Sequence, residues 1–140
     1  MSAKALFSVV VLFAVPLTCV SQPSSDGRTL RCTGQTCDLQ VAVACSSGVC
    51  VASIDKGTVQ VPQGNSPNII WQLQNPAYTF PSNGIVIANG GTEFDNCHVE
   101  ANGRRFKCHD KHTKAGRYKY TVNITGSPAV PPLDPFVDNQ

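Results

Sequence analysis

The chain has 140 residues, a net charge of +2 and seven cysteines. Once an N-terminal export signal is removed, its length is that of one domain. The composition argues against a nucleic-acid partner, because this predicted exported chain lacks a platform of interleaved aromatic and basic residues.

Residues 1–21 are predicted to be a cleaved signal peptide. Lys4 supplies a positive charge, residues 5–17 form an apolar run too short to span a bilayer, and small residues follow. The alternative is a lipid anchor at Cys19, because the tripeptide that ends there resembles the lipobox of bacterial lipoproteins. Either alternative predicts a periplasmic, outer-membrane-tethered or secreted protein.

Residues 22–37 are polar and rich in turn-forming residues, and we expect a leader or linker there. Residues 38–126 are predicted to be the folded domain, because short apolar–polar alternations are separated there by Gly, Pro, Asn and Asp. No stretch shows a sustained helical pattern. The predicted strands lie at 39–45, 49–52, 58–61, 69–73, 78–80, 85–88, 92–99, 104–108 and 118–124. This pattern indicates an all-β sandwich or small barrel, and we expect a small antiparallel β-sandwich with disulfides.

Two of these strands are predicted to form the centre of the core. The run 69–73 contains the only tryptophan, Trp71, and the run 118–124 contains Tyr118 and Tyr120. Aromatic side chains bury the most area per residue, so a small core forms where they gather. We therefore expect Trp71 and the two tyrosines to meet between the sheets.

Residues 127–140 are predicted to be a Pro-rich tail that runs over the surface, because proline is excluded from sheet interiors. Three of its residues, Leu133, Phe136 and Val137, are apolar. They either dock into another protein as an extended ligand or pack onto this chain's own sandwich. We expect the second.

Six of the cysteines are predicted to form three disulfides, because the chain is small and exported. Asn102-Gly103 is a strong signal for a two-residue hairpin turn. Counting outward from this turn places Cys97 opposite Cys108. The two residues fall at a hydrogen-bonded pair, where side chains lie farther apart, so a bulge or local twist is needed to join them.

The other four cysteines form two C-x4-C units. We expect the pairs Cys32–Cys37 and Cys45–Cys50, each closing a short loop. The competing arrangement is Cys32–Cys50 with Cys37–Cys45, since both pairs fit one antiparallel register.

Positive charge is concentrated between residues 104 and 119, where seven Lys and Arg stand against one acid. Strand alternation turns the basic side chains to one face and the aromatic ones to the other. The predicted contact surface consists of Arg105, Lys107, Arg117 and Lys119. Such a face would attract an anionic envelope polysaccharide or an acidic partner protein. Alternatively, the charges only keep exposed strands soluble and unpaired.

The histidines His98, His109 and His112 lie next to cysteines or close to one. A thiolate–imidazole zinc site needs free thiols, and the predicted Cys97–Cys108 disulfide removes them. We therefore expect no metal and no other cofactor.

The order of elements carries a resemblance. A V-x-V-x-x-G motif at 59–64 leads into the strand with Trp71, and a late G-x-Y-x-Y motif at 116–120 crosses the core. This order resembles the cupredoxin-like and immunoglobulin-like sandwiches. In blue-copper proteins the loop after such a tyrosine strand supplies copper ligands, whereas residues 122–125 here contain none. The resemblance therefore implies a fold without the copper site. The chain also resembles small exported bacterial domains of unknown function that end in a Tyr-Lys-Tyr strand and a Leu-Asp-Pro tail.

Catalytic motifs are missing from the sequence. It contains no Gly-x-Ser-x-Gly, no phosphate-binding glycine loop and no His-Glu-x-x-His, and its acids are scattered. We expect a non-catalytic binding or structural module rather than an enzyme. The alternatives are a metal-binding or redox protein derived from the cupredoxins, and a secreted inhibitor of another enzyme.

Overall fold

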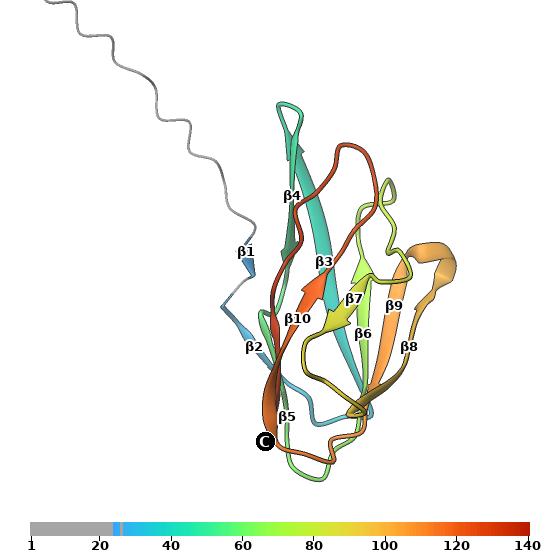
Figure 1. Cartoon of the computed structure of the whole chain (residues 1–140). Helices are drawn as coiled ribbons and strands as arrows, with labels where there is room; N and C mark the ends of the chain where they lie inside the picture. The colour runs from blue at the N-terminus through green and yellow to red at the C-terminus, as the bar shows by residue number, and fades with distance from the viewer. Residues whose placement is uncertain (1–23, 26) are drawn as a thin grey trace, which may run out of the picture.

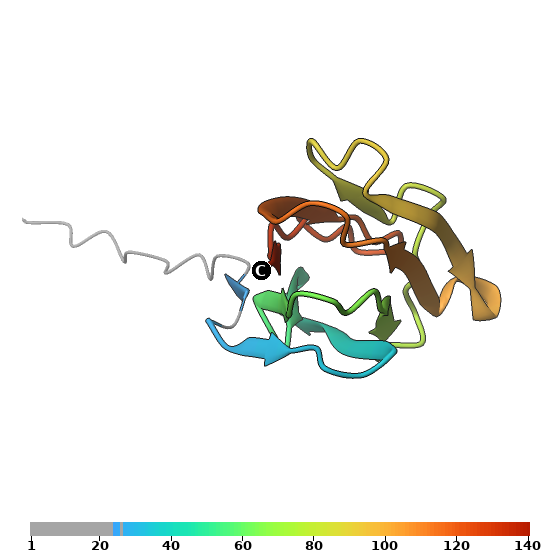
Figure 2. The same cartoon turned by 90° about the horizontal axis from the view of Figure 1, so that it is seen from below.

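The computed structural model describes residues 24–25 and 27–140, which form two β-sheets packed face to face (Figures 1 and 2). The predicted signal peptide and the lipidation candidate Cys19 lie outside the described residues. The described residues form eleven strands and one 3-10 turn and contain no α-helix, so the all-β prediction is confirmed. In chain order the elements are β1 (Ser24–Ser25), β2 (Thr29–Arg31), β3 (Thr36–Ser46), β4 (Val49–Ile54), β5 (Thr58–Val61), β6 (Asn68–Leu73), β7 (Ile85–Ile87), β8 (Phe94–Glu100), η1 (Ala101–Gly103), β9 (Arg105–Asp110), β10 (Gly116–Val122) and β11 (Phe136–Asn139).

The first sheet has the strand order β1-β4-β3-β6-β9-β8 and the second β2-β5-β11-β10-β7. Both sheets are mixed rather than antiparallel throughout, because β3 runs parallel to β6 and β5 runs parallel to both β2 and β11. The cause is the path of the chain. After the β3–β4 hairpin it crosses to the second sheet as β5 and returns as β6 beside β3. Strand alternation reveals which face is buried but not such crossings.

The predicted tail and leader both contribute strands. β11 lies between β5 and β10 in the interior of the second sheet, so a tail over the surface is wrong for residues 136–139. All prolines of the segment precede Phe136, which leaves β11 with every backbone N–H free to pair. In the predicted leader, β1 pairs with β4 and β2 pairs with β5. Leu133 and Val137 are buried, so these apolar residues pack onto their own sandwich as expected.

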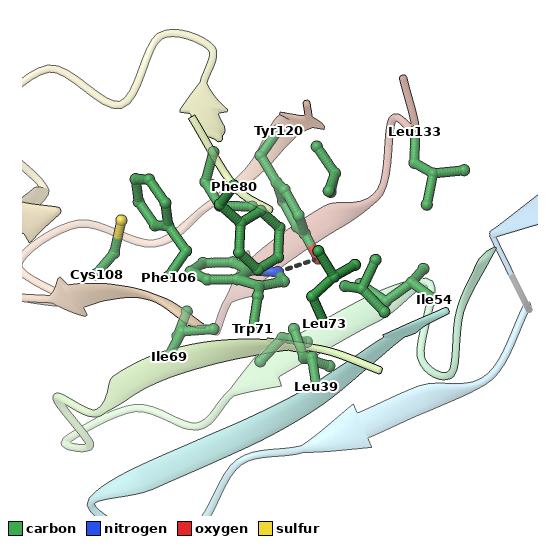
Figure 3. Packing of buried hydrophobic residues seen from close by; sticks show 14 of the residues in the cluster. Leu39, Ile54, Ile69, Trp71, Leu73, Phe80, Phe106, Cys108, Tyr120 and Leu133 are labelled. Atoms are coloured by element: carbon green, nitrogen blue, oxygen red, sulfur yellow. Dashed lines mark hydrogen bonds between the residues drawn. The ribbon is translucent and has the colours of Figure 1, made fainter. Parts of the chain in front are cut away.

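The core forms where the aromatic strands meet, as predicted. The Trp71 indole N–H donates to the Tyr120 hydroxyl at 3.2 Å, and the two rings contact edge to face with centroids 5.3 Å apart (Figure 3). Phe106 packs against Trp71 from the neighbouring strand. All three side chains are buried. Burial raises the pKa of Tyr120, which keeps its hydroxyl neutral as a hydrogen-bonding partner for Trp71.

The disulfides confirm the expected pairing. Cys32 is bonded to Cys37 across the turn between β2 and β3, and Cys45 to Cys50 across the β3–β4 hairpin, so the competing arrangement is wrong.

The third disulfide joins Cys97 to Cys108 across the β8–β9 hairpin. The hairpin register shifts between Asp95 and His98, which is the irregularity that the sequence required to bring the two sulfurs together. The Asn102-Gly103 turn forms as predicted, with positive φ at both residues.

Candidate binding surface

Charged side chains are distributed unevenly along the sandwich. The segments 39–54, 72–92 and 120–133 contain no Asp, Glu, Lys, Arg or His. Their turns gather at one end of the molecule, at the top of Figure 1, where the β3–β4 hairpin stands beside the β6–β7 and β10–β11 loops. We call this region, formed by residues 43–51, 74–84 and 123–133, the uncharged end.

Tyr78 fastens the three segments of the uncharged end to one another. Its side chain is buried, and its hydroxyl donates to the Pro128 carbonyl at 2.9 Å. The same oxygen lies 3.2 Å from the sulfur of Cys50 in the hairpin disulfide. Any side chain at Gly126 would overlap the Tyr78 ring, so the β10–β11 loop needs glycine to pack this closely. One phenol thus connects the β6–β7 loop to both of its neighbours.

Arg104 fastens the same loop from the other side. Its guanidinium donates hydrogen bonds to the backbone carbonyls of Leu73, Asn75 and Tyr78. The sequence places Arg104 in the basic run, but the structure uses its charge to order the backbone of a loop rather than to face solvent.

Backbone contacts complete the assembly. Thr79 and Thr125 exchange two N–H···O bonds of 2.9 and 2.8 Å, and Phe80 N–H donates to the Gly103 carbonyl at 2.7 Å. A β-carbon on Gly103 would lie 2.7 Å from that of Thr79, so the hairpin turn presses directly on the loop. The predicted strand at 78–80 is reduced to this short pairing.

The exposed part of the uncharged end consists of small, neutral groups. Ala44, Ala77 and Ala129 are exposed, as are several Ser and Pro residues around them. Val49, at 62% exposure, and Val86, at 47%, are the exposed large apolar side chains among the residues that the structure describes. The surface is therefore neutral and mildly apolar, and its loops are held by internal bonds.

The four residues of the predicted basic face are not brought together. Arg105 and Lys107 lie on β9 in the first sheet, whereas Arg117 and Lys119 lie on β10 in the second. Their side chains therefore extend from the outer faces of opposite sheets. Sequence alternation separates inward from outward positions, but it does not reveal that the chain changes sheets between β9 and β10.

The two basic residues on β9 share one acid. Glu100 lies 2.9 Å from the Arg105 guanidinium and 3.8 Å from the Lys107 ammonium. This acid stands at the end of β8, directly across the hairpin from Arg105.

The pair on β10 is compensated by residues from the segment predicted as a tail. Lys119 lies 2.9 Å from the Asp134 carboxylate, and hydrogen bonds from Lys119 and Thr121 hold the pKa of Asp134 below its usual value. The Arg117 guanidinium stacks 4.2 Å above the ring of Phe136. These basic groups are largely engaged within the molecule.

The opposite end of the sandwich, formed by residues 62–67, 93–95, 109–114 and 139–140, is the charged end. Asp110 is fully buried there. Its Oδ1 accepts the His112 backbone N–H at 2.9 Å and the Asn139 amide at 3.1 Å. Asp110 Oδ2 and Asn139 Oδ1 have no hydrogen-bond partner among the described residues. Burial raises the pKa of Asp110, because the charged form is poorly compensated.

Glu93 orders the loop that follows Asp110. Its carboxylate accepts the backbone N–H groups of Thr113 and Lys114 and the Thr113 hydroxyl. Burial raises the pKa of Glu93, but these hydrogen bonds outweigh it and hold the pKa below its usual value. The His112 ring bridges the carbonyls of Asn65 and Gln140 at 2.9 and 3.0 Å. The two buried carboxylates of this end thus bind its own backbone.

One hydrogen-bond chain at this end has the connectivity of a catalytic triad. Ser66 Oγ lies 3.1 Å from His109 Nε2, and His109 Nδ1 lies 2.8 Å from Asp95 Oδ1. However, the Ser66 hydroxyl donates to the Asp110 carbonyl at 2.7 Å, and the Ser66 N–H donates to the Asn65 side chain. The next residue is proline, which has no N–H to stabilise an oxyanion. The chain of bonds therefore fits a structural network better than a nucleophile.

The three histidines do not converge. All six of their ring nitrogens have hydrogen-bond partners within the molecule. Over residues 24–25 and 27–140, no group of three or more His, Cys, Asp or Glu side chains is arranged to hold a metal ion. The same part of the chain has no helix long and apolar enough to cross a membrane.

Comparisons with known proteins give a distant likeness. No protein-family model matches the chain, and no curated protein matches it. Among solved structures it is similar to rusticyanin, a copper protein, at 14% identity over 84% of this chain and 86% of that chain, with a TM-score of 0.39. Reduced rusticyanin gives 14% identity over 83% and 87% of the two chains, with a TM-score of 0.40. At identities and TM-scores this low, the likeness decides neither the fold nor a function.

The sheet topology differs from that of one of the two sandwich folds that the sequence resembles. Immunoglobulin-like sandwiches are built from antiparallel sheets, whereas both sheets here contain parallel pairs. The described residues form an all-β sandwich of two mixed sheets with three disulfides.

Tyr78 and Arg104 are not predicted from the sequence as residues of a candidate site. The sequence does contain a signal for this surface, because three long segments carry no charged residue.

Proposed function

We propose that the protein is an exported, non-catalytic binding module that contacts a partner protein through the uncharged end. The observation that carries this proposal is that Tyr78 joins three uncharged segments into one surface, while Arg104 orders the loop that bears Tyr78. The centres of protein–protein interfaces are depleted in charged residues, and binding loops are typically held by a rigid scaffold. The uncharged end meets both conditions.

The chemistry of the surface favours a protein as the partner. Binding to a membrane surface relies on large apolar side chains beside basic ones, and anionic polymers require uncompensated positive charge. The uncharged end presents alanine, proline, serine and exposed backbone instead. A secreted inhibitor of an enzyme would be one form of such a module.

Export is supported by the three disulfides, which form and persist in oxidising compartments. The signal peptide at 1–21 remains a prediction, as does the lipid anchor at Cys19. Contact with an anionic envelope surface through Arg105, Lys107, Arg117 and Lys119 has weaker support, because these residues lie on two faces and have internal partners.

The proposal is tested by photo-crosslinking in the cells that export the protein. A photoreactive residue is placed at Ala77 or Ala129 on the uncharged end and, as a matched control, at Ala115 beside the charged end; all three alanines are exposed. We expect one discrete adduct with another protein from positions 77 and 129 and none from 115. Mass spectrometry identifies the adduct, and Ala77→Arg should abolish the crosslink from 129.

Adducts from position 115 alone, or none from any position, would contradict the proposal. An association that is lost in high salt, and in a variant with all four basic residues changed to Ser, would instead favour the anionic surface.

A further inference from the structure

The three described disulfides differ in how a thiol from outside can reach them. The disulfide that closes the turn between β2 and β3 has both of its cysteines buried. In each of the two hairpin disulfides one cysteine is buried and the other exposed: Cys50 and Cys108 are buried, whereas Cys45 and Cys97 are exposed. Exchange begins when a thiolate attacks one sulfur, so it requires access to that sulfur. Among the described disulfides, the two in hairpins can therefore be attacked, each at its exposed cysteine.

The buried sulfur of each hairpin disulfide is then the one that leaves as a thiolate. Exchange is faster when the leaving thiolate is stabilised. Cys108 lies in the apolar core on the strand beside Ile69, and no group among the described residues donates a hydrogen bond to either sulfur of its disulfide (Figure 3). A negative charge formed on Cys108 would be desolvated without compensation. Attack on Cys97 should therefore be slow.

Cys50 differs from Cys108 because a phenol lies beside it. The Tyr78 hydroxyl oxygen is 3.2 Å from Cys50 Sγ and 3.6 Å from Cys45 Sγ. Its single proton is directed to the Pro128 carbonyl at 2.9 Å while the disulfide is intact, because a disulfide sulfur is a weak acceptor. A thiolate carries a full negative charge and accepts a stronger hydrogen bond. The hydroxyl is thus already in place to stabilise Cys50 as the leaving group.

We propose that the Cys45–Cys50 disulfide is a site of thiol–disulfide exchange for a partner that carries two thiols. A thiolate of the partner attacks Cys45 Sγ and forms a mixed disulfide, while the Cys45–Cys50 bond breaks and its electron pair stays on Cys50 Sγ. The Tyr78 proton turns to this thiolate. The partner's second thiolate then attacks the partner's sulfur in the mixed disulfide and releases Cys45 as a thiolate, which takes a proton from water. The hairpin cysteines end reduced, and the partner ends oxidised to its own disulfide.

Exchange at this site also changes how the uncharged end is held. Once the Tyr78 hydroxyl turns to the thiolate, the Pro128 carbonyl loses its donor, and the β10–β11 loop keeps its backbone pairing at Thr79 and Thr125. Hydrogen–deuterium exchange of residues 126–133 should therefore rise when this disulfide alone is reduced. The exchange does not depend on what the uncharged end binds, whereas regulation of that binding by exchange rests on the proposed function.

The test treats the folded mature chain, with its disulfides intact, with reduced glutathione followed by a pulse of iodoacetamide. Glutathione attacks one sulfur and stays on it, because it has no second thiol, and iodoacetamide alkylates the thiolate that leaves. Mass spectrometry of peptides identifies the cysteine that each reagent modifies. We expect glutathione on Cys45 and the alkyl group on Cys50, formed about tenfold faster than any modification of Cys97 or Cys108.

Two tyrosine-to-phenylalanine variants separate the hydrogen bond from a general loss of stability. Tyr78→Phe keeps the ring but removes the donor, and it should slow modification of Cys45 about five- to tenfold relative to that of Cys97 in the same sample. Tyr120→Phe removes another buried hydroxyl, which bonds to Trp71, and should leave this ratio unchanged. Thermal unfolding establishes that both variants are folded.

Modification of the β8–β9 disulfide before the β3–β4 disulfide would overturn the proposal. So would the reverse labelling, with glutathione on Cys50, or a Tyr78→Phe variant that reacts no more slowly than Tyr120→Phe. Disulfides that open together only when the chain unfolds would overturn it as well. These readouts involve no partner protein, and the crosslinks from the uncharged end are made on the oxidised chain. The two proposals can therefore fail separately.

Discussion

The two ends of the sandwich are held together by different kinds of side chain. At the uncharged end, the side chains of Tyr78 and Arg104 donate to backbone carbonyls of neighbouring segments. At the charged end, the carboxylates of Glu93 and Asp110 accept backbone N–H groups of the loop beside them. The charged end thus uses its charges on its own backbone. The abundance of charge in a region is therefore a poor guide to the surface that is free to bind.

The two ends should also respond differently to pH. The charged end depends on two buried carboxylates whose pKa values are shifted in opposite directions. At the uncharged end the contacts come from a guanidinium that stays protonated, a buried phenol and backbone groups. Perturbing each end separately would show how far this contrast extends.

The largest effect is expected for Tyr78→Ala. Truncating a buried aromatic residue costs about 3–5 kcal/mol, because it leaves a cavity between three segments. Tyr78→Phe keeps the ring and should cost only about 1 kcal/mol, for the hydroxyl contacts. Denaturant unfolding with the disulfides intact measures both values. Equal losses for the two variants would mean that the ring contributes little packing.

A matched pair of glycines compares steric constraint at the two ends. Gly103 at φ 84° faces Thr79 closely, whereas Gly64 at φ 83° lies in a turn of the charged end with no atom within 4 Å of an added β-carbon. Gly64→Ala should cost about 1–2 kcal/mol from backbone strain alone. Gly103→Ala should cost about 1–3 kcal/mol more, since Thr79 must move. Similar unfolding energies for the two variants would mean that the loop yields to the turn.

Arg104 and Arg105 are neighbours in the sequence but have different roles. Arg104 binds loop carbonyls, whereas Arg105 forms an ion pair at the surface. Arg104→Met should cost about 2 kcal/mol, because three loop carbonyls lose a charged donor. Arg105→Met removes a half-exposed ion pair with Glu100 and should change the unfolding energy by less than about 0.5 kcal/mol. Chemical denaturation at low and moderate salt distinguishes them. A large, salt-sensitive loss of stability in Arg105→Met would contradict the minor role given to this ion pair.

A smaller effect than the loss of Tyr78 or Arg104 is a pH dependence at the charged end. Because the pKa of Asp110 is raised on folding, its contribution to stability is present below the ordinary aspartate pKa of 3.8 and is lost as pH rises through the folded value. Asp110→Asn removes this loss and gives the orphaned Asn139 oxygen a neighbouring donor. The variant should be about 1 kcal/mol more stable than the parent at pH 8, and the difference should shrink toward pH 4.

The pKa of Glu93 is shifted in the opposite direction, so its contribution to stability depends on pH in the opposite way. Its pKa is lowered on folding, so its contribution is present above the ordinary value of 4.5 and is lost as pH falls through the folded value. Unfolding curves collected from pH 3 to 8 separate the two carboxylates. Parent and Asp110→Asn curves that stay parallel over this range would contradict the role given to Asp110.

Local features of the fold could be predicted from the sequence. Alternation located the strands around Trp71 and Tyr120, and the Asn102-Gly103 turn with its flanking cysteines gave the third disulfide. These features depend on residues near one another in the chain or on the burial of aromatic rings.

Features that depend on long-range topology could not be predicted. Arg105 and Arg117 have equivalent local patterns, yet they belong to different sheets because the chain crosses over between them. The uncharged end also depends on long-range topology, because Tyr78 contacts Cys50 and Pro128 only when three distant segments come together. The prolines of the segment 127–140 predict a tail, yet residues 136–139 form a strand because they follow the last of these prolines.

The central position of β11 has a consequence for biogenesis. β5 and β10 are both synthesised before β11, which must insert between them. Until residues 136–139 arrive, the second sheet is divided into two parts with unsatisfied edges facing each other. A chain with this topology cannot complete its second sheet progressively from the N-terminus during translation. The last strand to be synthesised is the one that joins the two parts of that sheet.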